Sequence, residues 1–145
     1  MEVYTIGFTK KTAAQFFGSI KRAGVKRLLD VRLNNSSQLA AFAKKEDLAY
    51  FLKEICGAEY THVPLLAPSK DMLDEYKKQK GSWQVYEERF LELMKQRRIE
   101  STLDRKLFDE PCVLLCSEAT AEHCHRRLVV NYLQEAWGNL QVKHL

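Results

Sequence analysis

The sequence lacks a long apolar run, a charged leader followed by apolar residues, and any internal repeat or low-complexity segment. No stretch approaches the roughly 20 apolar residues that a membrane-spanning helix needs, and the first residues do not have the pattern of a secretion signal. We therefore expect a cytoplasmic protein with no membrane partner. The chain has 145 residues, of which 46% are hydrophobic, so we expect one domain with a substantial core over residues 1–145.

The sequence also lacks a large excess of charge of either sign. Lys and Arg number 23 against 19 Asp and Glu, which gives a net charge of +4. This value is compatible with phosphate-bearing partners but far below that of a dedicated nucleic-acid binder. The expected partner is an anionic small molecule or a nucleotide, with nucleic acid as an alternative, and the charge leaves the oligomeric state open.

Cysteine is sparse too, with four residues at Cys56, Cys112, Cys116 and Cys124. This number is too small for a disulfide scaffold in a chain of this length, so thiols are expected in a reducing cytosol. Cys112 lies inside an apolar run and is assigned to the core, because free cysteine is among the most buried residue types. For Cys116 and Cys124 the pattern leaves packing and reactivity as open alternatives.

Short β-rich runs alternate with longer helical patterns along the chain. The runs that predict strands are 3–6, 28–32, 59–63, 112–116 and 140–144. Apolar residues at helical spacing separate them, as in the stripe of Ala13, Phe16, Phe17 and Ile20 before Gly24. Strands that alternate with helices favour a parallel sheet covered on both faces. The sequence therefore predicts a single-domain α/β fold, with a mainly parallel sheet of about five strands and helices on both faces.

Polar side chains follow several of these predicted strands, where open parallel sheets bind their ligands. The residues at these ends include Gly7, Thr9, Asp30, Arg32, His62, Cys116 and Glu118. They are far apart in the sequence, but the carboxyl ends of parallel strands meet at one edge of a sheet. We therefore expect them to gather at that edge.

The stretch 111–127 carries the densest group of reactive residue types. A buried strand is predicted up to Cys116, and a helix is predicted from Ala121 with Thr120 as its N-cap, so that Cys124 falls in the first turn. Such a helix start brings His125 and Arg126 close to the strand end. Backbone N–H groups at a helix N-terminus favour anions, so the stretch predicts an anion-binding pocket.

Several segments together resemble the family known as domain of unknown function 488. They include LLDVR at 28–32, LLCSE at 114–118 and CHRRLVV at 124–130. The resemblance singles out Gly7, Asp30, Arg32, Tyr60, Cys116, Glu118, Cys124, His125 and Arg126. Phe8 stands where the family usually has His after the first Gly. The resemblance implies a compact α/β domain but no established reaction.

An enzyme is the first functional hypothesis. Cys116 would be the nucleophile, His125 the acid or base, and Glu118 the residue that orients His125, while Asp30 belongs to the same catalytic set. Arg32 would hold a phosphate or carboxylate. The other residues expected to bind the ligand are Gly7, Thr9, Tyr60, His62, Cys124 and Arg126.

Two other classes and a structural explanation compete with this one. A zinc site would use Cys116 and Cys124 with a histidine, but the C-x-x-C spacing of clear zinc sites is missing, so no metal and no cofactor is expected. A non-catalytic module for nucleotide or nucleic acid would use Tyr60 or Trp83 for stacking. In the structural explanation, Asp30, Arg32, Glu118 and Arg126 only neutralise one another at a buried sheet end.

Overall fold

The computed structural model describes residues 1–34, 41–77, 79–117 and 124–145. The strands are β1 (Glu2–Gly7), β2 (Arg27–Asp30), β3 (Glu59–His62), β4 (Cys112–Cys116) and β5 (Gln141–His144). The α-helices are α1 (Ala13–Ala23), α2 (Lys45–Phe51), α3 (Lys70–Lys77), α4 (Trp83–Gln96), α5 (Ile99–Thr102) and α6 (His125–Trp137). Shorter helical turns cover Ala41–Ala43, Leu52–Cys56, Pro64–Leu66 and Arg105–Phe108.

The five strands form one parallel sheet in the order β3-β2-β4-β1-β5. In the register of this sheet Gly7 pairs with Cys116, and Asp30 pairs with Leu115. The ends of β1, β2 and β4 therefore lie side by side at one edge. The predicted fold class is confirmed, as is the expectation that these strand ends meet.

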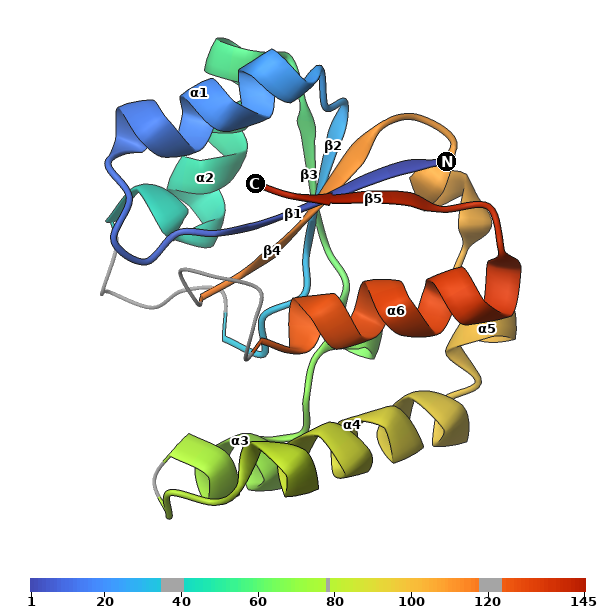
Figure 1. Cartoon of the computed structure of the whole chain (residues 1–145). Coiled ribbons are helices and arrows are strands. Elements are labelled where there is room, and N and C mark those ends of the chain that lie inside the picture. Colours follow the sequence, from blue (N-terminus) through green and yellow to red (C-terminus); the bar gives the residue numbers. More distant parts are fainter. Residues whose placement is uncertain (35–40, 78, 118–123) are drawn as a thin grey trace.

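Helices cover both faces of the sheet (Figure 1). On one face lie α1 and α2, whereas α6 lies against the other face, with α3 and α4 beyond α6. The first helix shows why the chain forms these elements. Thr12 and Gln15 form a capping box at its start, Phe16 and Ile20 face the core, and Gly24 ends it in a left-handed conformation with φ 70°.

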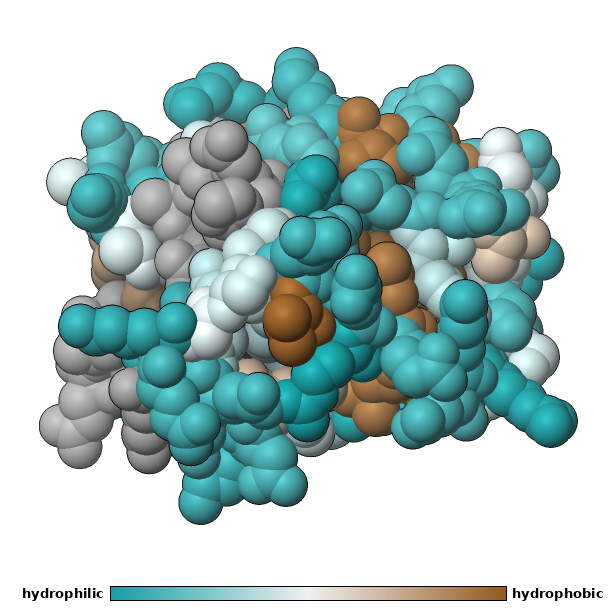
Figure 2. All heavy atoms as spheres, turned by 60° about the horizontal axis from the view of Figure 1, so that its bottom comes forward, coloured by the Kyte–Doolittle hydropathy of each residue, from teal (hydrophilic) through white to brown (hydrophobic). Residues whose placement is uncertain are grey.

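The surface over α3 and α4 is mainly hydrophilic. Figure 2 shows apolar side chains in separate small areas on this side, with polar side chains between them. Along the described parts of the chain, no helix is long and apolar enough to cross a membrane.

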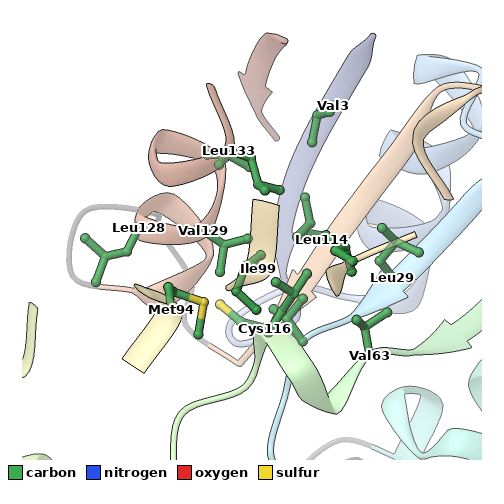
Figure 3. Packing of buried hydrophobic residues seen from close by; sticks show 14 of the residues in the cluster. Val3, Leu29, Val63, Met94, Ile99, Leu114, Cys116, Leu128, Val129 and Leu133 are labelled. Atoms are coloured by element: carbon green, nitrogen blue, oxygen red, sulfur yellow. The ribbon is translucent and has the colours of Figure 1, made fainter. Parts of the chain in front are cut away.

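The protein has two hydrophobic cores, one on each face of the sheet, and the side chains of β4 alternate between them. Cys112, Leu114 and Cys116 belong to the core on the α6 side, whereas Val113 and Leu115 belong to the core under α1 and α2. Figure 3 shows Cys116 on the same side of the sheet as Val129 of α6 and Met94 of α4. Alternation along a strand thus fixes the side of the sheet on which the Cys116 sulfur lies.

Some predicted boundaries are wrong. Helix α6 begins at His125, and Cys124 is its N-cap in an extended conformation, not a residue of the first turn. Thr120, the predicted N-cap, lies outside the described residues. Strand β2 ends at Asp30 instead of residue 32, because the chain turns there and the Asp30 side chain accepts the backbone N–H of Arg32. Ile55, predicted on the apolar stripe of the second helix, is 41% exposed.

Candidate functional site

A cavity of about 370 Å³ opens at the carboxyl edge of the sheet. It is lined by Thr9, Arg32, Leu33, Asn34, Pro68, Leu73, Tyr76, Lys77, Trp83, Tyr86, Cys116, Ser117, Cys124 and His125. Five of these belong to the predicted site, namely Thr9, Arg32, Cys116, Cys124 and His125. Neither Asp nor Glu occurs among the described residues of this lining, which does include two cationic side chains, Arg32 and Lys77. The charged side chains in the described part of the lining are therefore both cationic, and Arg32 is paired with Asp30.

Cys116 and Cys124 are joined by a disulfide across this edge. The expectation that all four cysteines are thiols is wrong for this pair, whereas Cys56 and Cys112 are free. Strand β4 ends at Cys116 and α6 begins after Cys124, so the two sulfurs meet at the end of the central strand. Both cysteines are almost fully buried, with exposed fractions of 1% and 2%.

Arg126 lies directly behind Cys116. Its side chain is completely buried, and Nη1 donates a hydrogen bond to Cys116 Sγ at 3.1 Å. A guanidinium in this position stabilises a thiolate. After reduction of the disulfide, the charge of Arg126 would therefore favour the ionised form of Cys116. The positive charge of Arg126 also extends to Lys11, whose pKa is lowered by burial and further by Arg126.

Asp30 and Arg32 form a buried ion pair beside the cavity. Arg32 Nε and Nη2 each donate to a different Asp30 carboxylate oxygen at 2.8 Å, and Tyr60 Oη donates to Asp30 Oδ2 at 2.6 Å. The Arg32 guanidinium also donates to the Ala43 carbonyl at 2.7 Å and lies over the Phe8 ring. The predicted network paired Asp30 and Arg32 with Arg126 and Glu118. In the described part of the chain Asp30 and Arg32 pair with each other, because the turn after β2 brings the Arg32 side chain back to Asp30. Glu118 lies outside the described residues, so its place in this network stays a prediction.

Two histidines are held by backbone carbonyls at this edge. His125 Nε2 lies 2.8 Å from the Val31 oxygen, and His62 Nε2 lies 2.9 Å from the Arg32 oxygen. A carbonyl oxygen only accepts, so Nε2 is the protonated nitrogen in each ring. In neutral His125 the second nitrogen, Nδ1, is then a proton acceptor, as a general base requires. His125 lines the cavity, whereas His62 does not.

The remaining predicted residues lie around the same strand ends. Gly7 ends β1 beside Cys116, and Thr9 contacts the neighbouring loop through a hydrogen bond from its backbone N–H to the Ser117 oxygen at 3.3 Å. The Thr9 hydroxyl donates to the same oxygen. Glu118, the predicted partner of His125, lies outside the described residues, so its role stays a prediction.

Three aromatic side chains form a wall of the cavity that the sequence analysis did not assign to the site as a group. Tyr76 comes from α3, and Trp83 and Tyr86 come from the first turn of α4. The i, i+3 spacing of Trp83 and Tyr86 was the signal for this wall, but the same spacing is typical of a helix face that packs into a core. The position of α4 opposite the sheet edge shows that these rings line the cavity and do not only pack into the core.

Cys112 provides an internal comparison for Cys116. It lies four residues earlier in β4, is completely buried, and has a pKa that burial raises to about 12.

The described residues contain no group of three or more His, Cys, Asp or Glu side chains placed to hold a metal ion. The zinc hypothesis therefore has no complete ligand set in the part of the chain that the structure describes.

Comparisons with known proteins give one match. A family model described as Domain of unknown function DUF488 matches residues 12–133. This span includes Asp30, Arg32, Cys116, Cys124 and His125, but not Gly7 and Thr9. Searches of curated proteins and of solved structures found no match.

Proposed function

Because the chain belongs to the family of domain of unknown function DUF488, whose description names no reaction, we propose a function from the site itself. The protein is a thiol-dependent enzyme that binds an anionic substrate at the carboxyl edge of its sheet. The observation that carries this proposal is the cavity that Cys116, His125 and Arg32 all line, with the buried Arg126 hydrogen-bonded to the Cys116 sulfur.

Cys116 is the proposed nucleophile. In the disulfide form its sulfur carries no thiolate, so the reaction needs the reduced protein. Once Cys116 is reduced, the Arg126 guanidinium stabilises its thiolate, which is the reactive form of cysteine. Sγ attacks an electrophilic atom of the substrate, a bond from sulfur to that atom forms, and the bond to the leaving group breaks with its electron pair on the leaving group.

His125 is the proposed proton carrier for this step. Its Nε2 is bonded to the Val31 carbonyl, which fixes the ring and leaves Nδ1 as the basic nitrogen. Nδ1 takes the proton from the Cys116 thiol and later delivers it to the leaving group. Water then hydrolyses the covalent adduct and restores the thiol.

Arg32 is the proposed anchor for the anionic group of the substrate. It lines the cavity and is 3% exposed, and its orientation is set by Asp30, Ala43 and Phe8. Asp30 was predicted as a catalytic residue. Its carboxylate accepts hydrogen bonds from Arg32 and Tyr60, so we propose that it positions Arg32 instead of reacting with substrate.

Alkylation of the reduced protein tests this proposal. After treatment with a dithiol and its removal, a small amount of iodoacetamide at neutral pH is expected to modify Cys116 well before Cys112. The reason is that Arg126 favours the thiolate of Cys116, whereas burial raises the pKa of Cys112 to about 12. Tandem mass spectrometry of the peptide that contains both residues reports the order, and inorganic phosphate is expected to slow the reaction at Cys116.

Two variants sharpen this experiment. Cys124→Ser leaves Cys116 without a disulfide partner and is expected to make its alkylation independent of prior reduction. Arg126→Gln keeps hydrogen-bond donors near the sulfur but removes the charge, so the alkylation rate at Cys116 is expected to fall. Equally slow modification of Cys116 and Cys112 in the reduced protein would contradict a nucleophilic role and leave only the structural network at this edge.

A further inference from the structure

The aromatic wall of the cavity has no role in the proposed thiol reaction. The Trp83 and Tyr86 rings are stacked, with centroids 5.3 Å apart and an interplanar angle of 24°. Tyr76 approaches both, at 5.6 Å from Trp83 and 4.9 Å from Tyr86. The three rings therefore form one connected surface, and each of them lines the cavity.

The burial of these rings differs in a way that suits a binding surface. Tyr86 is 5% exposed and stacks further on Phe90, so it supports Trp83 from the core side. Trp83 and Tyr76 are only partly buried, so they keep ring surface at the cavity. Aromatic side chains that keep ring surface accessible can stack with the planar bases of nucleotides.

The opposite side of the cavity is suited to a phosphate. It contains Arg32 and His125, and α6 begins there with an N-terminus at which the Cys124 side chain makes no capping hydrogen bond. This helix has 13 residues, and the positive end of its dipole lies at this N-terminus. A ligand that spans the cavity therefore meets Arg32 and the start of α6 on one side, and on the other side the aromatic rings with Lys77 over Tyr76.

We infer that the ligand of this cavity is a nucleoside monophosphate, with its base against Trp83 and Tyr76 and its phosphate beside Arg32. This inference depends on the proposed function in one respect, namely that the ligand carries an anionic group. The volume of about 370 Å³ lies at the small end of ligand sites, which run from about 300 to 1,000 Å³, and so favours a mononucleotide over a dinucleotide.

The chain offers a direct test because it has two tryptophans. Trp137 lies against Phe108 and Arg105 and does not line the cavity. In the variant Trp137→Phe, Trp83 is the only tryptophan and reports on the cavity alone. This variant is titrated with AMP, ribose 5-phosphate and inorganic phosphate, and binding is followed by fluorescence and by calorimetry.

AMP is expected to quench Trp83 and to bind about tenfold more tightly than ribose 5-phosphate, because only AMP carries a base that stacks. In the variant Trp83→Leu this difference is expected to disappear in calorimetry while the affinity for ribose 5-phosphate stays the same. Trp83→Phe keeps a ring and is expected to retain part of the difference, which separates a loss of stacking from a loss of folding. Trp137→Phe is the matched control and should bind AMP like the original chain.

Equal affinities for AMP and ribose 5-phosphate in the original chain would overturn the inference. If ribose 5-phosphate still slowed alkylation of Cys116, the proposed function would stand without a base site. Quenching of Trp83 by AMP without any slowing of that alkylation would support the inference and contradict the thiol reaction. Much tighter binding of a single-stranded oligonucleotide than of AMP would assign the surface to nucleic acid and overturn the mononucleotide.

Discussion

Four hydrogen bonds converge on the carboxylate of Asp30, which is completely buried. Three come from the backbone and side chain of Arg32, and one comes from Tyr60. A buried carboxylate is tolerated only when its charge is paired and its oxygens are bonded, so these donors are what allow the charge to remain at the sheet edge. The same bonds hold Arg32 in place beside the cavity.

The variant Tyr60→Phe tests the contribution of one of these donors. Loss of the hydroxyl removes a 2.6 Å hydrogen bond to Asp30 Oδ2, so the free energy of unfolding in urea is expected to fall by about 1 to 2 kcal/mol. Tyr50→Phe is the matched control, because the Tyr50 side chain is 62% exposed, and it should leave stability nearly unchanged. Equal unfolding midpoints for the two variants would show that the hydroxyl is not needed to stabilise the buried charge.

Asp30 and Arg32 could be identified from the sequence, but their pairing with each other could not. Alternation along a strand predicted that both side chains lie on one side, and the structure has them in direct contact. Their predicted partners were residues far along the chain. The nearer pairing was not evident because it depends on where β2 ends, and strand ends are set by the neighbouring strands and the turn instead of by the residue types.

At the scale of elements, Arg97 ties the end of α4 to the segment that follows β3. Its Nη1 donates to the carbonyls of Leu65 and Ala67, each at 2.7 Å, and this segment continues to Pro68 in the cavity wall. Burial lowers the pKa of Arg97, which is consistent with a guanidinium partly removed from water. The position of the wall therefore depends on a contact outside the cavity.

The variant Arg97→Gln is expected to loosen this segment. The substitution removes a charged donor that bonds to two carbonyls, so the free energy of unfolding should fall by about 1 kcal/mol. The loss would be larger for a fully buried donor, but Arg97 is partly exposed. It should also speed hydrogen exchange at the amides of Leu66 and Ala67. Arg98→Gln changes an exposed neighbour and serves as the control. Unchanged exchange at these amides in Arg97→Gln would mean that α4 does not hold the segment.

Helix α6 shows what limited the prediction of elements. Its apolar spacing predicted a helix with Leu128, Val129 and Leu133 inside, and all three are buried. Its first residue was predicted too early, because Thr120 is a good N-cap by residue type whereas Cys124 is a poor one. Cys124 is nevertheless the N-cap, and its sulfur bonds to Cys116 at the end of β4. The start of this helix therefore does not follow from the capping preference of the residue types alone.

At the scale of the whole molecule, the order β3-β2-β4-β1-β5 decides which residues meet. Strand β4 lies in the middle, between β2 and β1, so Cys116 ends close to both Asp30 and Gly7. Sequence patterns could predict a parallel sheet and a shared edge. They could not predict this order, nor that Tyr76, Trp83 and Tyr86 would together form a wall at the same edge, because both depend on packing between segments far apart in the chain.

The disulfide between Cys116 and Cys124 joins this central strand to α6, so it should affect the unfolding of the whole domain. It closes a short loop with a sequence separation of 8, for which the chain-entropy model gives a stabilisation on the order of 2 kcal/mol. Reduction with a dithiol is therefore expected to lower the free energy of unfolding by about that amount. Urea unfolding with and without the dithiol measures the difference.

A count of thiols in urea gives the independent check on this bond. Without reductant the unfolded chain is expected to show two reactive thiols, from Cys56 and Cys112, and after reduction all four cysteines should react. The variant Cys124→Ser removes the bond, so its stability should no longer respond to the dithiol, whereas Cys56→Ser should respond like the original chain. Four reactive thiols before reduction, together with the same urea midpoint in both conditions, would mean that Cys116 and Cys124 are held together by packing around Arg126 and not by a covalent bond.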